Sequence, residues 1–124
     1  MPNATRVLIA DDRPRSRRGL RALLTTQPGI EVVGEAGNGR EALRLVGETW
    51  PDAVLMDAKM PAMDGLTATR LIKERWPGIK VIVLTMYGAN RTDAMTAGAD
   101  AFLVKGCSAE KLLRAILDCE ERER

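Results

Sequence analysis

Short apolar runs recur along the chain and alternate with longer segments whose apolar positions follow a helical spacing. The runs have at most four residues, are nearly continuous and are rich in β-branched side chains, which is typical of strands buried on both faces of a parallel sheet. They are VLIA (7–10), VV (32–33), AVLM (53–56), VIVL (81–84) and AFLV (101–104). The pattern therefore predicts five buried strands.

The segments between these runs carry signals of helix starts. Asn38, followed three residues later by Glu41, resembles a capping box. Helices are expected to begin at or after Pro14, Asn38, Asp64, Arg91 and Ser108, the one at 91–97 being short and alanine-rich. Strands that alternate with helices predict an α/β fold, a doubly wound parallel sheet with helices on both faces. No repeat or linker divides the chain, so residues 1–124 are expected to form one domain.

Composition narrows the class of protein. No apolar stretch approaches the roughly 20 residues of a membrane helix and no signal peptide is recognised, so a cytoplasmic globular protein without membrane contact is expected. The net charge of +2 does not indicate nucleic-acid binding, and the early arginines are interpreted as a solvated face. The absence of histidine excludes histidine metal ligands and Ser-His-Asp triads. Cys107 and Cys119 lack CxxC spacing and are expected to be reduced thiols.

Polar residues follow four of the predicted strands. They are Asp11 and Asp12 after the first strand, Asp57 after the third, Thr85 after the fourth and Lys105 after the fifth. In such sheets the carboxyl ends of the strands share one edge, where ligands bind. Each residue also has a structural explanation, because the acidic pair could cap a helix, Thr85 could satisfy a loop and Lys105 could extend into solvent or pair with Asp57. Their convergence on one edge favours a shared site.

The residue types at this edge suit phosphoryl chemistry. Three neighbouring carboxylates repel one another and need a cation at neutral pH, and oxygen ligands of this kind suit Mg²⁺. A carboxylate beside Mg²⁺ can attack a phosphoryl group and form an aspartyl phosphate, while Lys105 and Thr85 meet the negative oxygens of that group. The sequence therefore predicts that Asp57 is phosphorylated.

VLIADD, LMDAKMPAMDG, VLT and AFLVKG occur in this order, and together they resemble the motifs of response-regulator receiver domains in two-component signalling. VVGEAGNGREAL and KGCSAEKLLRAI are similar to the NarL/FixJ-type subfamily. The resemblance covers essentially the whole chain and implies a flavodoxin-like fold with strand order 2-1-3-4-5. It also implies a phosphorylation-activated switch that is not an enzyme, except that it catalyses its own phosphorylation and dephosphorylation.

The resemblance assigns roles to single residues. The phosphoacceptor matches Asp57, the acidic Mg²⁺-binding pair matches Asp11 and Asp12, and the two groups that contact the phosphoryl oxygens match Thr85 and Lys105. It adds the backbone carbonyl of Lys59 as a metal ligand and Phe102 as an aromatic switch residue. Plain core packing is an equally good interpretation of Phe102.

The family also implies partners. A sensor histidine kinase is the expected phosphodonor, and whether the chain forms a homodimer stays open. Receivers of this subfamily usually precede a helix-turn-helix domain that binds DNA and regulates transcription. No such domain is present here, so either an excised or a stand-alone receiver is expected.

Two departures from the family pattern concern the pocket and the fourth helix. Arg13 follows the acidic pair where the subfamily often has histidine, which could change access to the pocket. Lys105 follows Thr85 by 20 positions, a residue or two fewer than the resemblance implies. The segment 86–100 between them has few large apolar residues and is expected to be the least stable part of the domain.

Other classes of protein fit the sequence less well. A phosphohydrolase with an aspartate nucleophile would carry a second carboxylate two positions later, where this chain has Lys59. A flavodoxin-type binder would need hydroxyl and glycine residues in place of DDRP after the first strand. The remaining alternative is a receiver that works as a protein-interaction module without phosphorylation. Such a receiver would be recognised by the loss of the acidic pair, the phosphoacceptor aspartate or the lysine, and this chain retains all of them.

Overall fold

The structure, a computed structural model, describes residues 4–86 and 91–117. Within these residues the strands are β1 (Thr5–Ala10), β2 (Ile30–Ala36), β3 (Ala53–Asp57), β4 (Lys80–Thr85) and β5 (Ala101–Val104). The helices are α1 (Pro14–Thr25), α2 (Gly39–Thr49), α3 (Gly65–Arg75), α4 (Arg91–Thr96) and α5 (Ala109–Leu117). The expectations for Cys119 and for part of the 86–100 segment lie outside the described residues.

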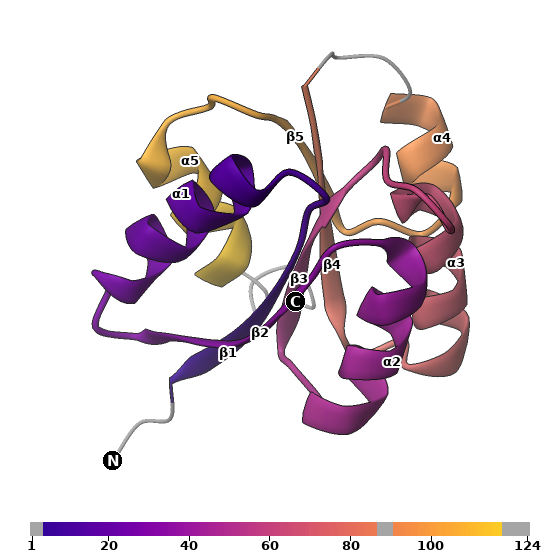
Figure 1. Cartoon of the computed structure of the whole chain (residues 1–124), viewed down its shortest axis with the longest axis horizontal. Coiled ribbons are helices and arrows are strands. Elements are labelled where there is room, and N and C mark those ends of the chain that lie inside the picture. The colour runs from indigo at the N-terminus through magenta and orange to yellow at the C-terminus, as the bar shows by residue number, and fades with distance from the viewer. Residues whose placement is uncertain (1–3, 87–90, 118–124) are drawn as a thin grey trace, which may run out of the picture.

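The strands of the described chain are all parallel and form one sheet in the order β2-β1-β3-β4-β5 (Figure 1). This order confirms the predicted flavodoxin-like topology. Each predicted apolar run lies inside a strand, but VV (32–33) is only the middle of the longer β2. Most of β2 is half-buried because it lies at the edge of the sheet, so its sequence lacks the continuous apolar run of the central strands.

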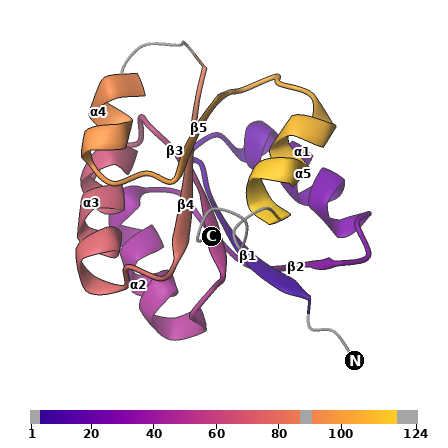
Figure 2. The same cartoon turned by 180° about the vertical axis from the view of Figure 1, so that it is seen from behind.

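Helices cover both faces of the sheet, with α1 and α5 on one face and α2, α3 and α4 on the other (Figures 1 and 2). Successive strand residues point to opposite faces. In β1, Val7 and Ile9 pack in the cluster that contains residues of α1 and α5, whereas Leu8 and Ala10 pack in the other cluster. The central strands are therefore apolar at consecutive positions, which is why the runs were readable as buried parallel strands.

The starts of α2 and α3 follow the predicted capping chemistry. Asn38 Oδ1 accepts a hydrogen bond from the Glu41 N–H at 2.8 Å, as a capping box requires. The Glu41 carboxylate accepts from the N–H of Gly37 at 2.7 Å, one residue before the cap. Asp64 Oδ1 accepts from the Thr67 N–H at 2.8 Å. These caps set where each helix begins relative to the strand before it.

The short helix predicted at 91–97 is confirmed as α4, which ends one residue earlier and buries a single residue, Ala94. The chain beside it is held by Lys73 of α3, whose Nζ lies 2.9 Å from Asp100 Oδ2 and donates to the carbonyl of Ile79 at 2.8 Å. In the part of the chain that the structure describes, no helix has the length and apolar character needed to cross a membrane.

Candidate functional site

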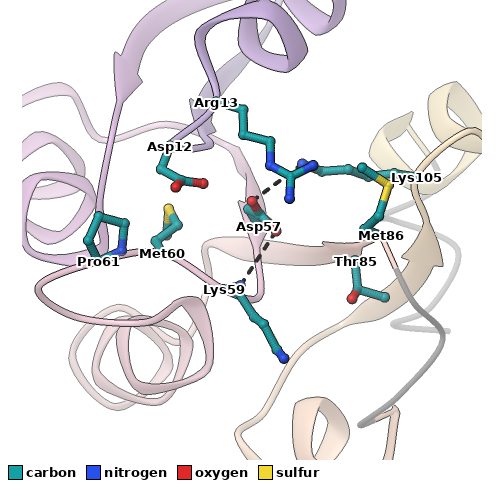
Figure 3. Close-up of a pocket in the computed structure, with 9 residues that line it drawn as sticks. All are labelled: Asp12, Arg13, Asp57, Lys59, Met60, Pro61, Thr85, Met86 and Lys105. Carbon is teal, nitrogen blue, oxygen red and sulfur yellow. Dashed lines mark hydrogen bonds and ion pairs between the residues drawn. The ribbon is translucent and has the colours of Figure 1, made fainter.

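The carboxyl ends of β1, β3, β4 and β5, which are neighbours in the sheet, bring the predicted site residues to one edge. A pocket of about 420 Å³ opens there (Figure 3). It is lined by Asp12, Arg13, Asp57, Lys59, Met60, Pro61, Thr85, Met86 and Lys105. Asp11 is not among these lining residues, but its buried carboxylate contacts Lys105, which is.

Asp11 is the most enclosed carboxylate of the site, with 1% of its surface exposed. Its Oδ2 accepts hydrogen bonds from Lys105 Nζ at 2.7 Å and from Ser16 Oγ at 2.6 Å, and its Oδ1 accepts from the backbone N–H of Arg13 at 2.9 Å. Burial alone would raise the pKa of Asp11, but these hydrogen bonds and the Lys105 charge outweigh it and hold the pKa below its usual value. Asp11 is therefore ionised at neutral pH.

The acidic pair does not cap the first helix. The N-cap of α1 is Arg13, which makes no side-chain capping bond, and Pro14 occupies the first helical turn as predicted. The structural explanation of the acidic pair as a helix cap is therefore wrong, and its carboxylates are directed to the site instead.

Asp57 ends β3 with 7% of its surface exposed. Its Oδ2 lies 3.3 Å from Lys105 Nζ, and its Oδ1 accepts a long hydrogen bond of 3.5 Å from the Lys59 N–H. Burial raises the pKa of Asp57; the Lys105 charge lowers it and the neighbouring Asp11 charge raises it again, so that the pKa lies above its usual value. Asp57 is thus the less well neutralised of the two buried carboxylates, and an added cation would stabilise its charge.

A glycine fixes the turn that follows Asp57. The Gly65 N–H donates to the carbonyl of Ala58 at 2.9 Å, and a Cβ at position 65 would overlap the Asp57 carbonyl. No other residue allows this close approach of two backbones. The start of α3 therefore packs directly against the strand end that carries Asp57.

Lys105 lies between the two buried carboxylates, with 11% of its side chain exposed. The expectation that it extends into solvent is therefore wrong, whereas the ion pair with Asp57 is present and is shared with Asp11. The Lys105 N–H also donates to the Thr85 carbonyl at 2.7 Å, which holds the end of β5 against the end of β4. Thr85 itself is 6% exposed and lines the same pocket.

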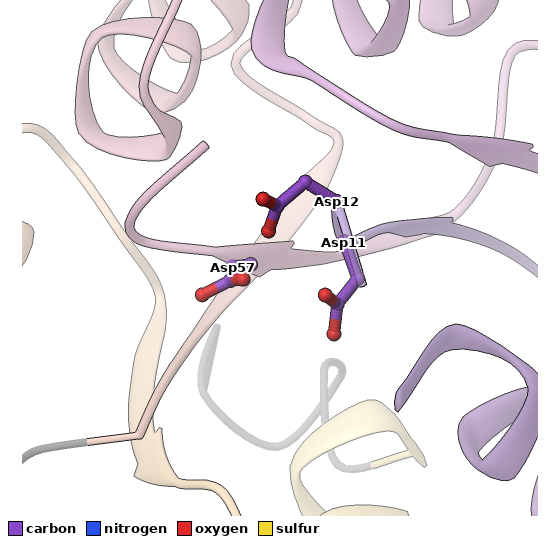
Figure 4. A group of neighbouring side chains, drawn as sticks. All are labelled: Asp11, Asp12 and Asp57. Atoms are coloured by element: carbon purple, nitrogen blue, oxygen red, sulfur yellow. The ribbon is translucent and has the colours of Figure 1, made fainter. Parts of the chain in front are cut away.

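Three carboxylates gather at the ends of β1 and β3, as Figure 4 shows. Asp11, Asp12 and Asp57 each offer an oxygen, and these oxygens lie within 4.8 Å of one another. Asp12 is exposed, and its side chain makes no hydrogen bond or ion pair to any other residue among those described. Lys105 pairs with two of these three carboxylates but carries a single positive charge, so the cluster keeps an excess of negative charge. An all-oxygen donor set with an excess of negative charge fits a hard divalent cation such as Mg²⁺.

A family profile described as the response regulator receiver domain matches residues 7–117, which include all of these strand ends. This chain belongs to the response regulator receiver domain family. The match covers most of the chain, as the resemblance of its motifs predicted.

Individual proteins that are similar to this receiver domain identify its subfamily. It is 45% identical over 111 residues to the transcriptional regulatory protein YhcZ of Bacillus subtilis, a match that covers 88% of this chain and 52% of that protein. The signal receiver domain of NarL from Mycobacterium tuberculosis has 32% identity and a TM-score of 0.90, with 97% of this chain and 98% of that chain covered.

CheY from Borrelia burgdorferi, in a complex with CheX, BeF3 and Mg, has 29% identity and a TM-score of 0.84, with 95% and 89% covered. The matches to the NarL receiver domain and to YhcZ confirm the predicted NarL-type subfamily. The chain spans about half the length of the curated relatives it matches.

Phe102 of the receiver domain lies in the core on the side of α2, α3 and α4, with 9% of its surface exposed. The Arg91 guanidinium, at the start of α4, lies 5.7 Å from the centre of the ring. This distance is within the range of a cation–π contact. Core packing therefore describes Phe102 in this structure, and its role as a switch residue stays a prediction.

Two residues of α1 support the site in ways that sequence reasoning missed. Ser16 donates to Asp11 Oδ2, and Arg17 donates to the Asp11 carbonyl at 2.6 Å and to Glu35 Oε1 of β2 at 3.1 Å. Arg21 pairs with the same glutamate, so the solvated-face interpretation is wrong for Arg17 and incomplete for Arg21. The four-residue spacing of Arg17 and Arg21 indicates that both lie on one face of the helix. Their shared partner, Glu35 of β2, could not be inferred from the sequence.

Proposed function

We propose that this receiver domain is a phosphorylation-activated switch in which Asp57 accepts a phosphoryl group from a sensor histidine kinase. The observation that carries the proposal is the setting of Asp57, a buried carboxylate that lines a pocket, shares a lysine with Asp11 and lies beside a third carboxylate. The only reactions that this proposal assigns to the chain are its own phosphorylation and dephosphorylation.

The chain's own side chains would assist the transfer as follows. A carboxylate oxygen of Asp57 attacks the phosphorus, and the leaving group departs on the opposite side. The transferring group spreads negative charge over its equatorial oxygens, so it needs donors around it. The Lys105 ammonium is already 3.3 Å from Asp57, and the Thr85 hydroxyl belongs to the same pocket. Asp11 orients Lys105 through its 2.7 Å contact.

We assign Mg²⁺ to the carboxylates of Asp11, Asp12 and Asp57 and to the backbone carbonyl of Lys59. When bound, the ion supplies positive charge that offsets the carboxylates and the phosphoryl oxygens. The cluster of three carboxylate oxygens supports this assignment, as does the similarity to CheY, whose complex contains BeF3 and Mg.

Intact-mass spectrometry tests the proposed function. The chain incubated with acetyl phosphate and Mg²⁺ should gain one phosphoryl group, and the same mixture with EDTA should leave the mass unchanged. A chain that gained no phosphate from acetyl phosphate, from phosphoramidate or from a phosphorylated histidine kinase would contradict the proposal.

Asp12→Ala is expected to weaken Mg²⁺ binding by about tenfold or more, because Asp12 is the exposed carboxylate without a protein partner among the described residues. Arg13→Ala, which removes a nearby positive charge, should strengthen binding slightly. Isothermal titration calorimetry with MgCl₂ measures both. Equal affinities in the two variants would show that Asp12 does not ligate the ion.

The conformational response is proposed to pass through α4. Thr85 and Phe102 lie on the adjacent strands β4 and β5, and Arg91 of α4 contacts the Phe102 ring. A shift of Thr85 toward the phosphoryl group would change the packing under this helix. The relative YhcZ is a transcriptional regulatory protein, and this chain spans about half of its length. The output is therefore proposed to be transcription regulation, through a helix-turn-helix domain outside this sequence that would provide the contact with DNA.

Hydrogen exchange should find α4 less protected than α5. α4 buries only Ala94, and an alanine contributes roughly a third of what a leucine does, whereas α5 buries Leu112 and Ile116. A helix of six residues also recovers little of its nucleation cost. Amides of 91–98 should exchange much faster than those of 109–117, and phosphorylation should slow them. Equal protection, unchanged by phosphate, would mean that the signal leaves by another face.

A further inference from the structure

Arg13 lines the pocket but has no part in the function proposed above. Its backbone is held in place, because its N–H donates to Asp11 Oδ1 at 2.9 Å and its carbonyl accepts from the Arg17 N–H at 2.9 Å. Its side chain is exposed and makes no hydrogen bond or ion pair with the rest of the described chain. A fixed backbone thus presents an uncommitted guanidinium beside the acidic pair.

The exposed lining residues form the rim of the pocket, and Arg13 lies on the side of the acidic pair. In Figure 3 its side chain runs from the loop after β1 across the pocket toward Asp57 and Lys105. The ammonium of Lys59, also on the rim, points away from Asp57 in the same view. Of the two exposed cations that line the pocket, Arg13 is therefore the one whose side chain points toward Asp57 in this view.

In-line transfer determines what a rim residue can contact. The leaving group lies opposite the attacking oxygen, on the open side of the pocket, while the equatorial oxygens are directed toward the groups around Asp57. We propose that Arg13 binds the leaving group of a small phosphodonor and makes the domain selective for acyl phosphates, whose leaving group is a carboxylate. This inference rests on the proposed function of Asp57.

The chemistry distinguishes two classes of donor. With acetyl phosphate, the bond from Asp57 to phosphorus forms as the bond from phosphorus to the acetate oxygen breaks, and the electron pair leaves on acetate as negative charge. A guanidinium can stabilise that carboxylate with two parallel hydrogen bonds. With phosphoramidate, whose nitrogen is already protonated, the phosphorus–nitrogen bond breaks and neutral ammonia leaves. The guanidinium then has no developing charge to stabilise.

Arg13→Ala tests the proposal, with Arg18→Ala as a control that removes the same charge from an exposed position of α1 outside the pocket lining. Phosphorylation rates are measured by intact mass at saturating Mg²⁺ with each donor. Arg13→Ala should lower the rate with acetyl phosphate by about tenfold and leave the rate with phosphoramidate within about twofold. Arg18→Ala should match the parent with both donors, and Arg13→Lys, which keeps the charge without the planar fork, should be intermediate.

The outcomes separate this proposal from the function on which it rests. Equal rate losses with both donors, or no loss with either, would overturn the leaving-group contact while leaving Asp57 as the acceptor. A parent chain that takes phosphate from no donor would contradict both the leaving-group contact and the proposed function of Asp57.

A binding measurement gives a second readout that needs no turnover. Phosphonoacetate, a stable mimic of acetyl phosphate, should shift the Arg13 Nε–Hε resonance in NMR spectra with Mg²⁺ present. Methylphosphonate, which lacks the carboxylate, should shift it much less. Equal shifts with the two probes would also overturn the proposal.

Discussion

Asp57→Asn is expected to lower phosphoryl uptake from acetyl phosphate by at least about a hundredfold, because an amide lacks the nucleophilic oxygen and the charge of a carboxylate. The loss should reflect chemistry and not unfolding. The pKa of Asp57 is raised by burial, so its charge lowers the stability of the folded domain at neutral pH. Asparagine, similar in shape and uncharged, should therefore leave the metal-free domain as stable as the parent or more so. Intact mass measures the uptake, and thermal unfolding measures the stability.

Asp64→Asn is the matched control for this substitution. Asp64 caps α3 through the Thr67 N–H, and asparagine caps helices as well as aspartate does, so both the fold and the uptake should be retained. If Asp57→Asn incorporated phosphate at the rate of this control, another residue would be the acceptor.

Lys105→Met should destabilise the metal-free domain at neutral pH by about 3 kcal/mol, the order expected when one partner of a buried ion pair is removed. The reason is that Lys105 neutralises both Asp11 and Asp57 in a setting where it is itself nearly buried. Removal leaves two buried carboxylates without their cation. The same variant should fail to hold the phosphoryl group in its productive position, so phosphorylation should no longer protect α4 from hydrogen exchange.

The pH dependence gives this prediction a sign. In the parent, the folded-state pKa of Asp11 lies below its unfolded value, so its contribution to stability is present above the unfolded pKa and is lost as pH falls through the folded pKa. Without Lys105, the pKa of Asp57 should rise further above its usual value, because burial and the Asp11 charge raise it and the lysine no longer opposes them. The pKa of Asp11 should also rise relative to the parent, because Asp11 loses the hydrogen bond and the charge of Lys105. The contribution of Asp57 to stability is then present below its unfolded pKa and is lost as pH rises through its folded pKa.

The difference between the parent and Lys105→Met should therefore shrink in acid. It should also shrink when Mg²⁺ is added at neutral pH, because the ion replaces the lost positive charge. Urea unfolding across the acidic range measures this difference. Lys111→Met, which removes a lysine from an exposed position of α5, should show no such dependence. A destabilisation of Lys105→Met that stayed constant with pH and Mg²⁺ would mean that packing, and not charge, is what Lys105 contributes.

Local pattern was sufficient to place the elements of this domain and the edge of its site. Continuous apolar runs are readable as central strands because both of their faces are buried, and Asn38 and Asp64 mark helix starts through bonds to residues three positions later. The polar residues after four strands could be assigned to one edge because parallel strands all end on the same side of their sheet. Each of these inferences depends on interactions between near neighbours in sequence or on a rule of topology.

Only the tertiary structure decided how the charges pair. Lys105 lies closer to Asp11 than to Asp57, although it is far from both in sequence. Arg17 of α1 pairs with Glu35 of β2. Such pairings depend on differences of a few tenths of an ångström in the distances between side chains from different elements, and residue types do not encode those differences locally. The sequence by itself determined that carboxylates, a hydroxyl and a lysine would meet. Packing decided which carboxylate the lysine neutralises most fully, and so which one is left under-neutralised beside the pocket.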